Sequence, residues 1–406
     1  MLYKDKNLEY LYYSNILDNK KIDFKDNKDL KKDAKSSTIK FFLNSELDYN
    51  NKYVKYYYLL SLRNAVLSKN VGEYILNELK PDYFVNLHAI YSTWAPAFDF
   101  LKKNGVECVV FAGGSNHTYN PQDAIFCHVP KQILTRGRLW QDFKNRPVTD
   151  DMRKKVNEYF SRRENLKLKD TKVFYNEISE ELKVDKNGSK RYHIALFPSV
   201  IWDGNISERH VAFSGIIDWL VSTIEFLSKR DDVKIYLRLH PSEVTMFKGT
   251  KKIQDLLKNF LKNIDPNKLV VIPSEKKINT YKFIRSGIDL GIVYDGILAL
   301  ELPYLRVPTL LGAVKGRFTV DGGNFSINSR EDYFNVLENI DSFIDDFHNN
   351  YEDYYTNIVR YTYFYIFECP MKFPTMPKNF ELGNFNLFDL TKEQLKLPEK
   401  LIKILI

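Results

Sequence analysis

The sequence predicts an α/β protein with two Rossmann-like domains facing a cleft, followed by a helical segment at the C-terminal end. Three observations predict this class. The chain has 406 residues, which suits two domains of roughly 150–200 residues each. Short apolar runs rich in β-branched and aromatic residues alternate with longer amphipathic stretches, as is typical of parallel sheets with crossover helices. A segment rich in lysine and acidic residues, 165–190, lies between the two halves and is the expected linker.

The chain therefore divides into three predicted parts. Residues 1–188 form a first α/β domain, residues 189–345 form a second, and residues 346–406 form a helical tail. The aromatic stretch 351–367 is the expected long helix of this tail. We expect it to pack back on the first domain.

Apolar periodicity and turn residues predict the elements of the first half. Residues 38–43, T-I-K-F-F-L, are rich in β-forming residues and are the expected first strand. Residues 53–79 are apolar at helical spacing, with Gly72 as the expected break between two helices. The remaining predictions are strands at 83–87, 107–112 and 124–129, and helices at 92–104 and 150–163, the last capped by Thr149 or Asp150.

The second half alternates more regularly. Its predicted strands are 192–197, 233–239, 268–272, 288–294 and 308–311, and its predicted helices are 212–229, 250–263, 277–286 and 297–302. Polar residues follow the first four strands, in the segments P-S-V-I-W-D-G-N, H-P-S-E, P-S-E-K-K and D-G. Because the carboxyl ends of parallel strands meet at one edge of a sheet, these segments are expected to form one ligand-binding rim.

Charge and composition narrow the class of partner. The formal net charge is +8, but lysines and acidic residues are interspersed over most of the chain. Nucleic-acid binding would need a concentrated basic face, so we expect no nucleic-acid partner. A mildly basic surface suits an anionic donor molecule, an anionic glycan or a membrane face equally well.

Cysteine usage and hydropathy predict the compartment. Cys108, Cys127 and Cys369 have neither metal-ligand spacing nor the pattern of a disulfide framework, which fits a reducing cytoplasm. No stretch reaches the about 18 apolar residues of a spanning helix. The ending L-P-E-K-L-I-K-I-L-I is either a final packed element or a peripheral contact at the inner face of the membrane.

The stretch V-K-I-Y-L-R-L-H-P-S-E, residues 233–243, is the centre of the predicted rim. Pro241 must end the strand, because proline cannot continue a ladder. His240 could then donate to a phosphate oxygen, and Arg238 lies on the same strand face. The guanidinium suits a diphosphate, or it pairs with an acid such as Glu243.

Four further positions belong to the predicted donor-binding set, which also includes Gly204. Ser274 follows the next strand, in P-S-E-K-K. Gly296 opens a short helix whose N–H groups suit phosphate, and Asp295 beside it is expected to cap that helix. Glu301 lies on the same helix, where it either reaches ribose hydroxyls or is an ordinary surface glutamate.

Four motifs together resemble a known family. W-D-G-N (202–205), F-S-G-I-I-D-W-L (213–220), R-L-H-P-S-E (238–243) and Y-D-G-I-L-A-L-E-L-P-Y-L-R-V-P-T-L-L (294–311) are similar to segments of the capsule polysaccharide biosynthesis glycosyltransferases. That group includes the capsular Kdo transferases, and K-G-R-F-T-V-D-G (315–322) also resembles the segment that follows in them. The resemblance covers about residues 195–325.

This resemblance implies a GT-B fold, with a nucleotide-sugar donor in the second domain and a glycan or lipid-linked glycan acceptor on the first. It implies that His240 and Pro241 belong to the donor phosphate site and that Glu301 matches the family's helix glutamate. The chain departs from the family at Asp295-Gly296, where relatives carry two hydroxyl residues. Backbone N–H groups would have to replace those contacts.

Glycosyl transfer needs a base for the acceptor hydroxyl. Asp203-Gly204 resembles the acidic-Gly pair of bacterial sialyltransferases, which use CMP-activated acidic sugars. His88, after a predicted strand, and His117, in the loop that begins Gly113-Gly114, are the other candidates. No D-x-D with a metal-binding context is present, so metal-independent transfer without a cofactor is expected.

Two alternatives stay open at this point. A CDP-polyol phosphotransferase of the teichoic-acid type shares the two-Rossmann architecture and an R-x-H-P-like element. A catalytically silent glycan-binding or scaffold protein is the second alternative, and the Asp295-Gly296 departure keeps it in view. The donor that binds and the group that is transferred would separate the three readings.

Overall fold

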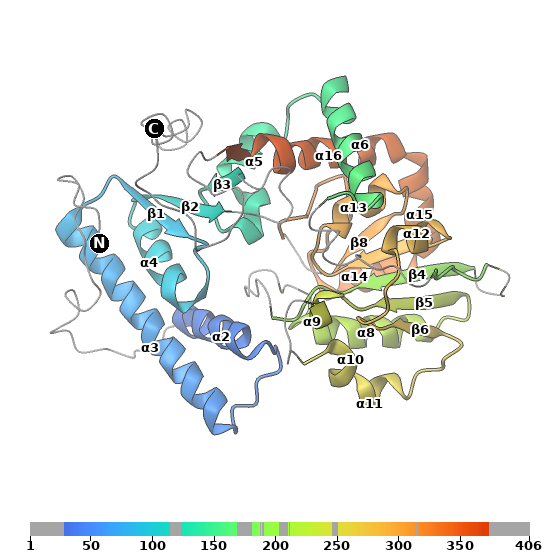
Figure 1. The fold of residues 1–406 in the computed structure, drawn as a ribbon, viewed down its shortest axis with the longest axis horizontal. Helices are drawn as coiled ribbons and strands as arrows, with labels where there is room; N and C mark the ends of the chain where they lie inside the picture. The colour runs from blue at the N-terminus through green and yellow to red at the C-terminus, as the bar shows by residue number, and fades with distance from the viewer. Residues whose placement is uncertain are drawn as a thin grey trace.

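The computed structural model describes residues 28–113, 123–168, 181–186, 188, 191–202, 210, 212–245, 251–312 and 316–372. Two sheets organise these residues, one with four strands in the order β1-β2-β3-β9 and one with five in the order β6-β5-β4-β7-β8. Figure 1 shows the two sheets in separate halves, with helices packed around each. The predicted α/β class with a C-terminal helical segment is confirmed.

The five-stranded sheet is parallel throughout. Its strands are β4 (Tyr192–Phe197), β5 (Val233–Arg238), β6 (Leu269–Ile272), β7 (Leu290–Val293) and β8 (Thr309–Leu311). The chain runs outward from β4 through β5 to β6, then returns to the other side of β4 with β7 and β8. This is a Rossmann-type order with its switch point between β4 and β7. The four strand ends singled out in the sequence therefore lie at one edge.

Helices connect these strands. They are α8 (Ile216–Ser228), α9 (Ser242–Thr245), α10 (Ile253–Leu256), α11 (Lys258–Leu261), α12 (Thr280–Arg285) and α13 (Leu298–Tyr304), followed by α14 (Arg330–Glu338) and α15 (Ile340–Asn349). The single helix predicted over 250–263 is wrong. Leu257 leaves helical geometry, with φ −94° and ψ 3°, and separates α10 from α11.

The four-stranded sheet is mixed. Its strands are β1 (Tyr83–Leu87), β2 (Glu107–Gly113), β3 (Asp123–Cys127) and β9 (Pro370–Lys372), and α4 (Tyr91–Lys103) connects β1 to β2. The β1–β2 pair is parallel, whereas β3 lies antiparallel to both β2 and β9. A parallel crossover needs a dozen or more residues, and the connection between β2 and β3 is shorter than that.

Two long helices pack against each other and against α4 in this half: α2 (Lys28–Phe42) and α3 (Lys52–Tyr74), which continues into the π-helical turn η1 (Ile75–Leu79). The strand predicted over 38–43 is wrong, because these residues belong to α2 up to Phe42. Buried residues recur every four positions, at Leu30, Ala34 and Thr38, and the Thr38 Oγ1 donates to the Ala34 carbonyl at 2.7 Å. Packing of that helical face overrides the local β propensity.

The break predicted at Gly72 is also wrong, because α3 runs through it. Gly72 is where α3 lies against α4: a Cβ there would stand 3.1 Å from the Ala97 Cα. A Gly72→Leu variant should therefore force the helices apart and lower the free energy of unfolding by about 1–3 kcal/mol. Chemical denaturation would measure this, with Asn64→Leu on the exposed face of α3 as the control; equal stability of the two variants would contradict the close contact.

The chain closes on itself through its last described elements. The remaining helices are η2 (Lys131–Arg136), α5 (Arg138–Phe143), α6 (Asp150–Glu164), α16 (Tyr351–Tyr363) and the π-helical turn η4 (Phe364–Glu368). Thr149 caps α6 by accepting from the Met152 N–H. Helix α16 packs on α6 and α13, and β9 then joins the first sheet beside β3.

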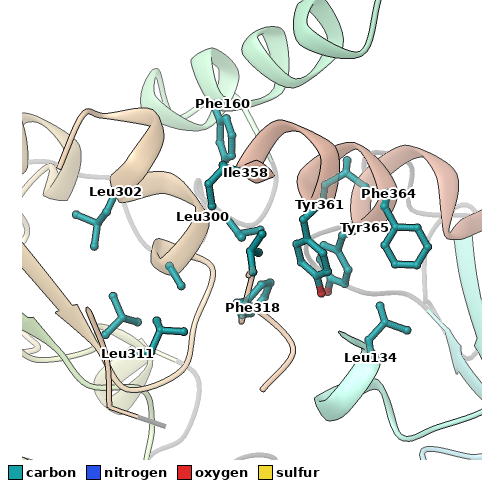
Figure 2. Close-up of a cluster of buried hydrophobic side chains, with 14 of the residues drawn as sticks. Leu134, Phe160, Leu300, Leu302, Leu311, Phe318, Ile358, Tyr361, Phe364 and Tyr365 are labelled. Atoms are coloured by element: carbon teal, nitrogen blue, oxygen red, sulfur yellow. The ribbon is translucent and has the colours of Figure 1, made fainter. Parts of the chain in front are cut away.

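One apolar core joins the two halves. Figure 2 shows Leu134 and Phe160 of the first half, and Leu300 and Leu311 of the second, gathered around the side chains of α16 and η4. Tyr361 from α16 and Tyr365 from η4 are fully buried in this cluster. The second half has an additional core around Trp219 and Tyr333. The predicted domain limits at 188 and 345 remain predictions.

The described residues also bear on the cysteines and on membrane spans. Cys108, Cys127 and Cys369 are buried thiols. Within the described ranges no helix has both the length and the apolar character to cross a bilayer. Most of the predicted linker and the C-terminal L-P-E-K-L-I-K-I-L-I lie outside the described residues.

Candidate functional site

A cavity of about 600 Å³ lies at the carboxyl edge of the parallel sheet. Its floor comes from the second half, where Val200 and Ile201 follow β4 and Tyr294 follows β7. These strands flank the switch point, the place where ligands of open α/β sheets bind. Its opposite wall comes from the first half, through α2 and the loop after it. The cavity therefore lies between the two halves at the position that the fold makes available.

The N-terminus of α8 opens into this cavity through Ser214, Gly215 and Ile216. Gly215 is the N-cap residue and has no side chain to bond the first-turn N–H groups, so these groups face the opening with the positive end of the helix dipole. The arrangement suits a phosphate or a carboxylate.

Asp218 on the first turn of α8 does not oppose this use. Its carboxylate accepts from the Ser214 N–H at 2.8 Å and from the Arg330 guanidinium at 3.2 Å. Burial by itself raises the pKa of Asp218, but these hydrogen bonds and the charge of Arg330 hold it below its ordinary value. The anionic charge is thus balanced inside the protein.

Helix α2 gives the cavity a cationic wall. Lys28, Lys32 and Lys35 recur at a spacing of four and three, so they share one helix face, and all three line the opening. Asp29 and Glu46 also contribute to the lining. The lysines come from the first half and the α8 N-terminus from the second, so an anion in the cavity would contact both halves.

His210 supplies an imidazole to the lining of the cavity. Its Nδ1 is hydrogen-bonded to the hydroxyl of Tyr294, whose side chain is buried at the end of β7. This bond orients the imidazole and makes the other ring nitrogen, Nε2, the one that would exchange a proton with a substrate. His210 was not among the predicted site residues; its place between β4 and α8, next to the predicted rim, is the sequence signal that could have identified it.

The ends of β5 and β6 form a second polar group on the same edge. His240 lies two residues after the end of β5, and its Nδ1 accepts from the Ser242 N–H at 3.1 Å. A ring that accepts at Nδ1 is neutral and carries its proton on Nε2, as a donor. Burial, with a smaller contribution from the Arg238 guanidinium, lowers the pKa of His240 to about 4. Along the chain, Pro241 separates His240 from the start of α9.

Three residues predicted to bind the donor also hold this edge of the sheet together, and their donor-binding role stays a prediction. Arg238 is buried and donates to the Pro273 carbonyl at 2.8 Å. Glu243 is buried too, and accepts from the Ile253 N–H at 3.0 Å and from the Ser274 hydroxyl. Burial raises the pKa of Glu243. These bonds tie α9 to the start of α10 and to the loop after β6, and they set the position of His240.

The half-buried His240 predicts a pH dependence of stability. The ordinary pKa of histidine, 6.5, applies to the unfolded chain, and the folded value is about 4. Between these values the unfolded chain binds more protons, so the free energy of unfolding should fall as the pH drops from about 6.5 to about 4. Urea denaturation across this range should show a shallower fall for His240→Gln.

His128 and His193 also have lowered pKa values because they are buried. Both histidines lower the free energy of unfolding at acidic pH in the parent protein and in His240→Gln alike. The difference between the two curves of unfolding free energy against pH therefore isolates the contribution of His240. Parallel curves for the parent protein and His240→Gln would contradict the assignment.

The turn after β7 differs from the sequence expectation. Asp295 does not cap α13: the helix begins after Ile297 and has no side-chain cap. The Asp295 carboxylate instead lies against Gly316, where a Cβ would stand 3.1 Å from Oδ1. Gly296 has open space around its Cα, since the nearest side chain would be 3.9 Å from an added Cβ.

Glu301 is buried between the two halves. Its carboxylate pairs with the Arg163 guanidinium of α6 and accepts from the Tyr281 hydroxyl of α12 at 2.8 Å. The alternative of an ordinary surface glutamate is therefore wrong. This carboxylate is the centre of an ion pair across the core, so it is already engaged by Arg163 and Tyr281. Its donor-binding role, implied by the resemblance, stays a prediction.

Of the predicted bases, the structure describes His88 alone. It follows β1, with its ring 6.3 Å from that of Trp94. His88, Ala89 and Tyr91 all have positive φ, at 64°, 48° and 72°, a strained backbone of the kind that clusters at functional sites. Asp203, Gly204 and His117 lie outside the described residues.

The described lining of the cavity contains none of the predicted site residues, although Asp295 adjoins Tyr294, which lines it. In the described part of the chain no three His, Cys, Asp or Glu side chains are arranged to hold a metal ion.

No protein-family model and no curated protein sequence matches this chain. Among solved structures it is similar to the Thermosulfurimonas dismutans KpsC beta Kdo 2,4 transferase, with 12% identity, a TM-score of 0.40, and coverage of 62% of this chain and 74% of that one. The beta Kdo 2,7 transferase of the same organism gives 13% identity, a TM-score of 0.39 and coverage of 63% and 72%.

The UDP-GlcNAc 2-epimerase of Neisseria meningitidis bound to UDP-GlcNAc gives 13% identity, a TM-score of 0.29 and coverage of 74% and 80%. Two of these three neighbours are Kdo transferases, the group that the sequence motifs resemble. All three TM-scores lie below 0.5, so the description of the fold rests on the strand order given above.

Proposed function

We propose that this protein is a metal-independent glycosyltransferase that moves a sugar from a nucleotide-activated donor to a cell-surface glycan. A CMP-activated acidic sugar is the favoured donor, on the resemblance of the rim motifs to capsular Kdo transferases. The observation that carries the proposal is the cavity at the switch point, where the α8 N-terminus and the lysines of α2 face one space. Such a site suits the phosphate of a nucleotide sugar.

The chemistry can be assigned to residues of this cavity. His210 accepts the proton of the acceptor hydroxyl through Nε2, while the bond from sugar carbon to phosphate oxygen breaks and the new glycosidic bond forms. The departing nucleotide takes the electron pair of the broken bond as a phosphate oxygen. The N–H groups of α8 and the ammonium groups of Lys28 and Lys32 stabilise that charge.

Binding of nucleotides to the full chain tests this proposal. CMP, CDP, UDP and GDP are compared by thermal shift, and one of them at about 100 times its Kd should stabilise the protein by about 2.7 kcal/mol. Transfer is then assayed with the matching activated sugar, with and without EDTA. Loss of transfer in EDTA, restored by Mg²⁺ or Mn²⁺, would contradict the metal-independent mechanism.

The buried pair of Glu301 and Arg163 favours a second candidate, a catalytically silent glycan-binding or scaffold protein. The glutamate that the resemblance assigns to the donor is here part of the core. This candidate is supported if no nucleotide shifts the melting temperature while a glycan does. A shift by CDP with transfer of a polyol phosphate would instead support the teichoic-acid type of enzyme.

A further inference from the structure

The outward face of α3 exposes large apolar side chains. The exposed fraction is between 36% and 68% for Tyr53, Tyr56, Leu59 and Leu60. Each of these residues lies within one helical turn of another, so together they form a continuous apolar surface. The opposite face, with Val54 and Ala65 among others, is buried against α2 and α4. Figure 1 shows α3 along the outer edge of the first half, with α2 and α4 on its inner side. Contiguous exposed apolar residues of this kind mark an interaction surface.

The charges beside these apolar residues on α3 have one sign, and the acidic residue of the helix, Glu73, lies in its last turn and pairs with Lys69. Lys52, Lys55 and Arg63 are exposed beside these apolar residues, and the sequence from Lys52 to Gly72 contains no acidic residue. A helix that combines a basic, lysine-rich rim with exposed tyrosine and leucine has the composition of an interfacial membrane helix. Long basic side chains at such a surface can lay their stems along apolar neighbours and keep the charge at the headgroups; the Lys52 ammonium already lies 5.1 Å from the centre of the Tyr53 ring.

A second copy of the chain is a less suitable partner for this face. In a twofold contact the same surface meets itself, so these three cations would face their own copies without an acidic residue of α3 between Lys52 and Gly72 to balance them. An anionic lipid bilayer would match both the exposed apolar side chains and the cations of α3, because its headgroups are negative and its interior is apolar.

We propose that the outer face of α3 binds the surface of an anionic lipid bilayer, with Tyr53, Tyr56 and Leu60 entering the headgroup region and Lys52 and Lys55 contacting lipid phosphates. This assigns the membrane contact to α3 and not to the C-terminal segment. It does not depend on the proposed glycosyl transfer.

The placement of α2 links this surface to the cavity. One face of α2 packs on α3, and another lines the cavity through Lys28, Lys32 and Lys35. Packed helices lie about 8–10 Å apart, so a bilayer on α3 would lie about one helix diameter beyond the cavity wall. A lipid-linked acceptor could then reach the cavity without leaving the membrane surface.

Vesicle co-sedimentation of the full chain tests the proposal. The probes are vesicles with equal parts of phosphatidylglycerol and phosphatidylcholine, and vesicles of phosphatidylcholine alone. The parent protein should bind the anionic vesicles at least tenfold more tightly, because each basic residue near the surface adds to the attraction. The triple variant Tyr53→Gln/Tyr56→Gln/Leu60→Gln and the double variant Lys52→Glu/Lys55→Glu should each lower that binding about tenfold or more.

The matched control is Lys258→Glu/Lys262→Glu, which makes the same change in net charge at two exposed positions on and beside α11. It should bind like the parent, and all four proteins should have similar melting temperatures because the changed residues are exposed. The proposal is overturned if the parent fails to bind vesicles, if the α3 variants bind as the parent does, or if the control loses binding equally. A dimer that the triple variant abolishes, in a parent that ignores vesicles, would assign the surface to a second copy.

Discussion

An Arg163→Met variant is expected to lose about 3–5 kcal/mol of unfolding free energy. The substitution keeps the apolar stem but leaves the Glu301 carboxylate, whose side chain is 2% exposed, without its cation. The Tyr281 hydroxyl would remain as its hydrogen-bond donor. A buried carboxylate with so little compensation is costly, and the loss falls on the junction between α6 and α13.

A double-mutant cycle measures this loss. Chemical denaturation of Arg163→Met, Glu301→Leu and the double variant should show that the double variant is more stable than either single variant, because it buries no unmatched charge. Additive losses would contradict the ion pair as the source of the effect. Nucleotide thermal shift on the stable double variant then tests the donor role of Glu301: an unchanged shift would exclude that role.

The second large effect is expected in catalysis. His210→Gln should lower kcat by about 10²–10⁴-fold, the usual contribution of a positioned general base. The amide can still bond the Tyr294 hydroxyl, so the cavity should keep its shape and KM should change little. Steady-state kinetics across pH would also show loss of the acidic limb that a histidine base produces.

Two variants sharpen that test. Tyr294→Phe removes the orienting bond but leaves the imidazole, and we expect a smaller fall in kcat with a shifted pH profile. His348→Ala, on the exposed side of α15, should leave kcat unchanged. If His88→Ala abolishes transfer and His210→Gln does not, the base lies in the first half, as the sequence prediction allows.

Much of the second half follows from local sequence. Its strands are short apolar runs bounded by proline, glycine or charged turns, and the predicted ends agree with β4 and β5 to within a residue. The rim follows as well, because parallel strands must end together. In the first half, the local β propensity of residues 38–43 predicted a strand. Burial of Leu30, Ala34 and Thr38 on one face stabilises a helix there.

The cavity itself could not be predicted, since its walls join residues near Lys32 to residues near His210. No local pattern links segments so far apart. The same holds for the pair of Arg163 and Glu301, which are 138 positions apart. Arg163 looks like any arginine of a charged helix until α13 is packed against it. Long-range packing, not residue type, gives such residues their roles.

The return of β9 to the first sheet has a consequence for synthesis on the ribosome. The strand at Pro370–Lys372 completes a sheet that begins at Tyr83, and Glu301 supplies the counter-charge of Arg163. The first half therefore cannot complete its sheet or its buried ion pair until the second half has been translated. A truncated chain of residues 1–188 should stay sensitive to protease, whereas the full chain resists it; cooperative unfolding of the fragment would contradict this. During translation of the second half the unpaired edge of β3 stays exposed, and an exposed strand edge favours aggregation.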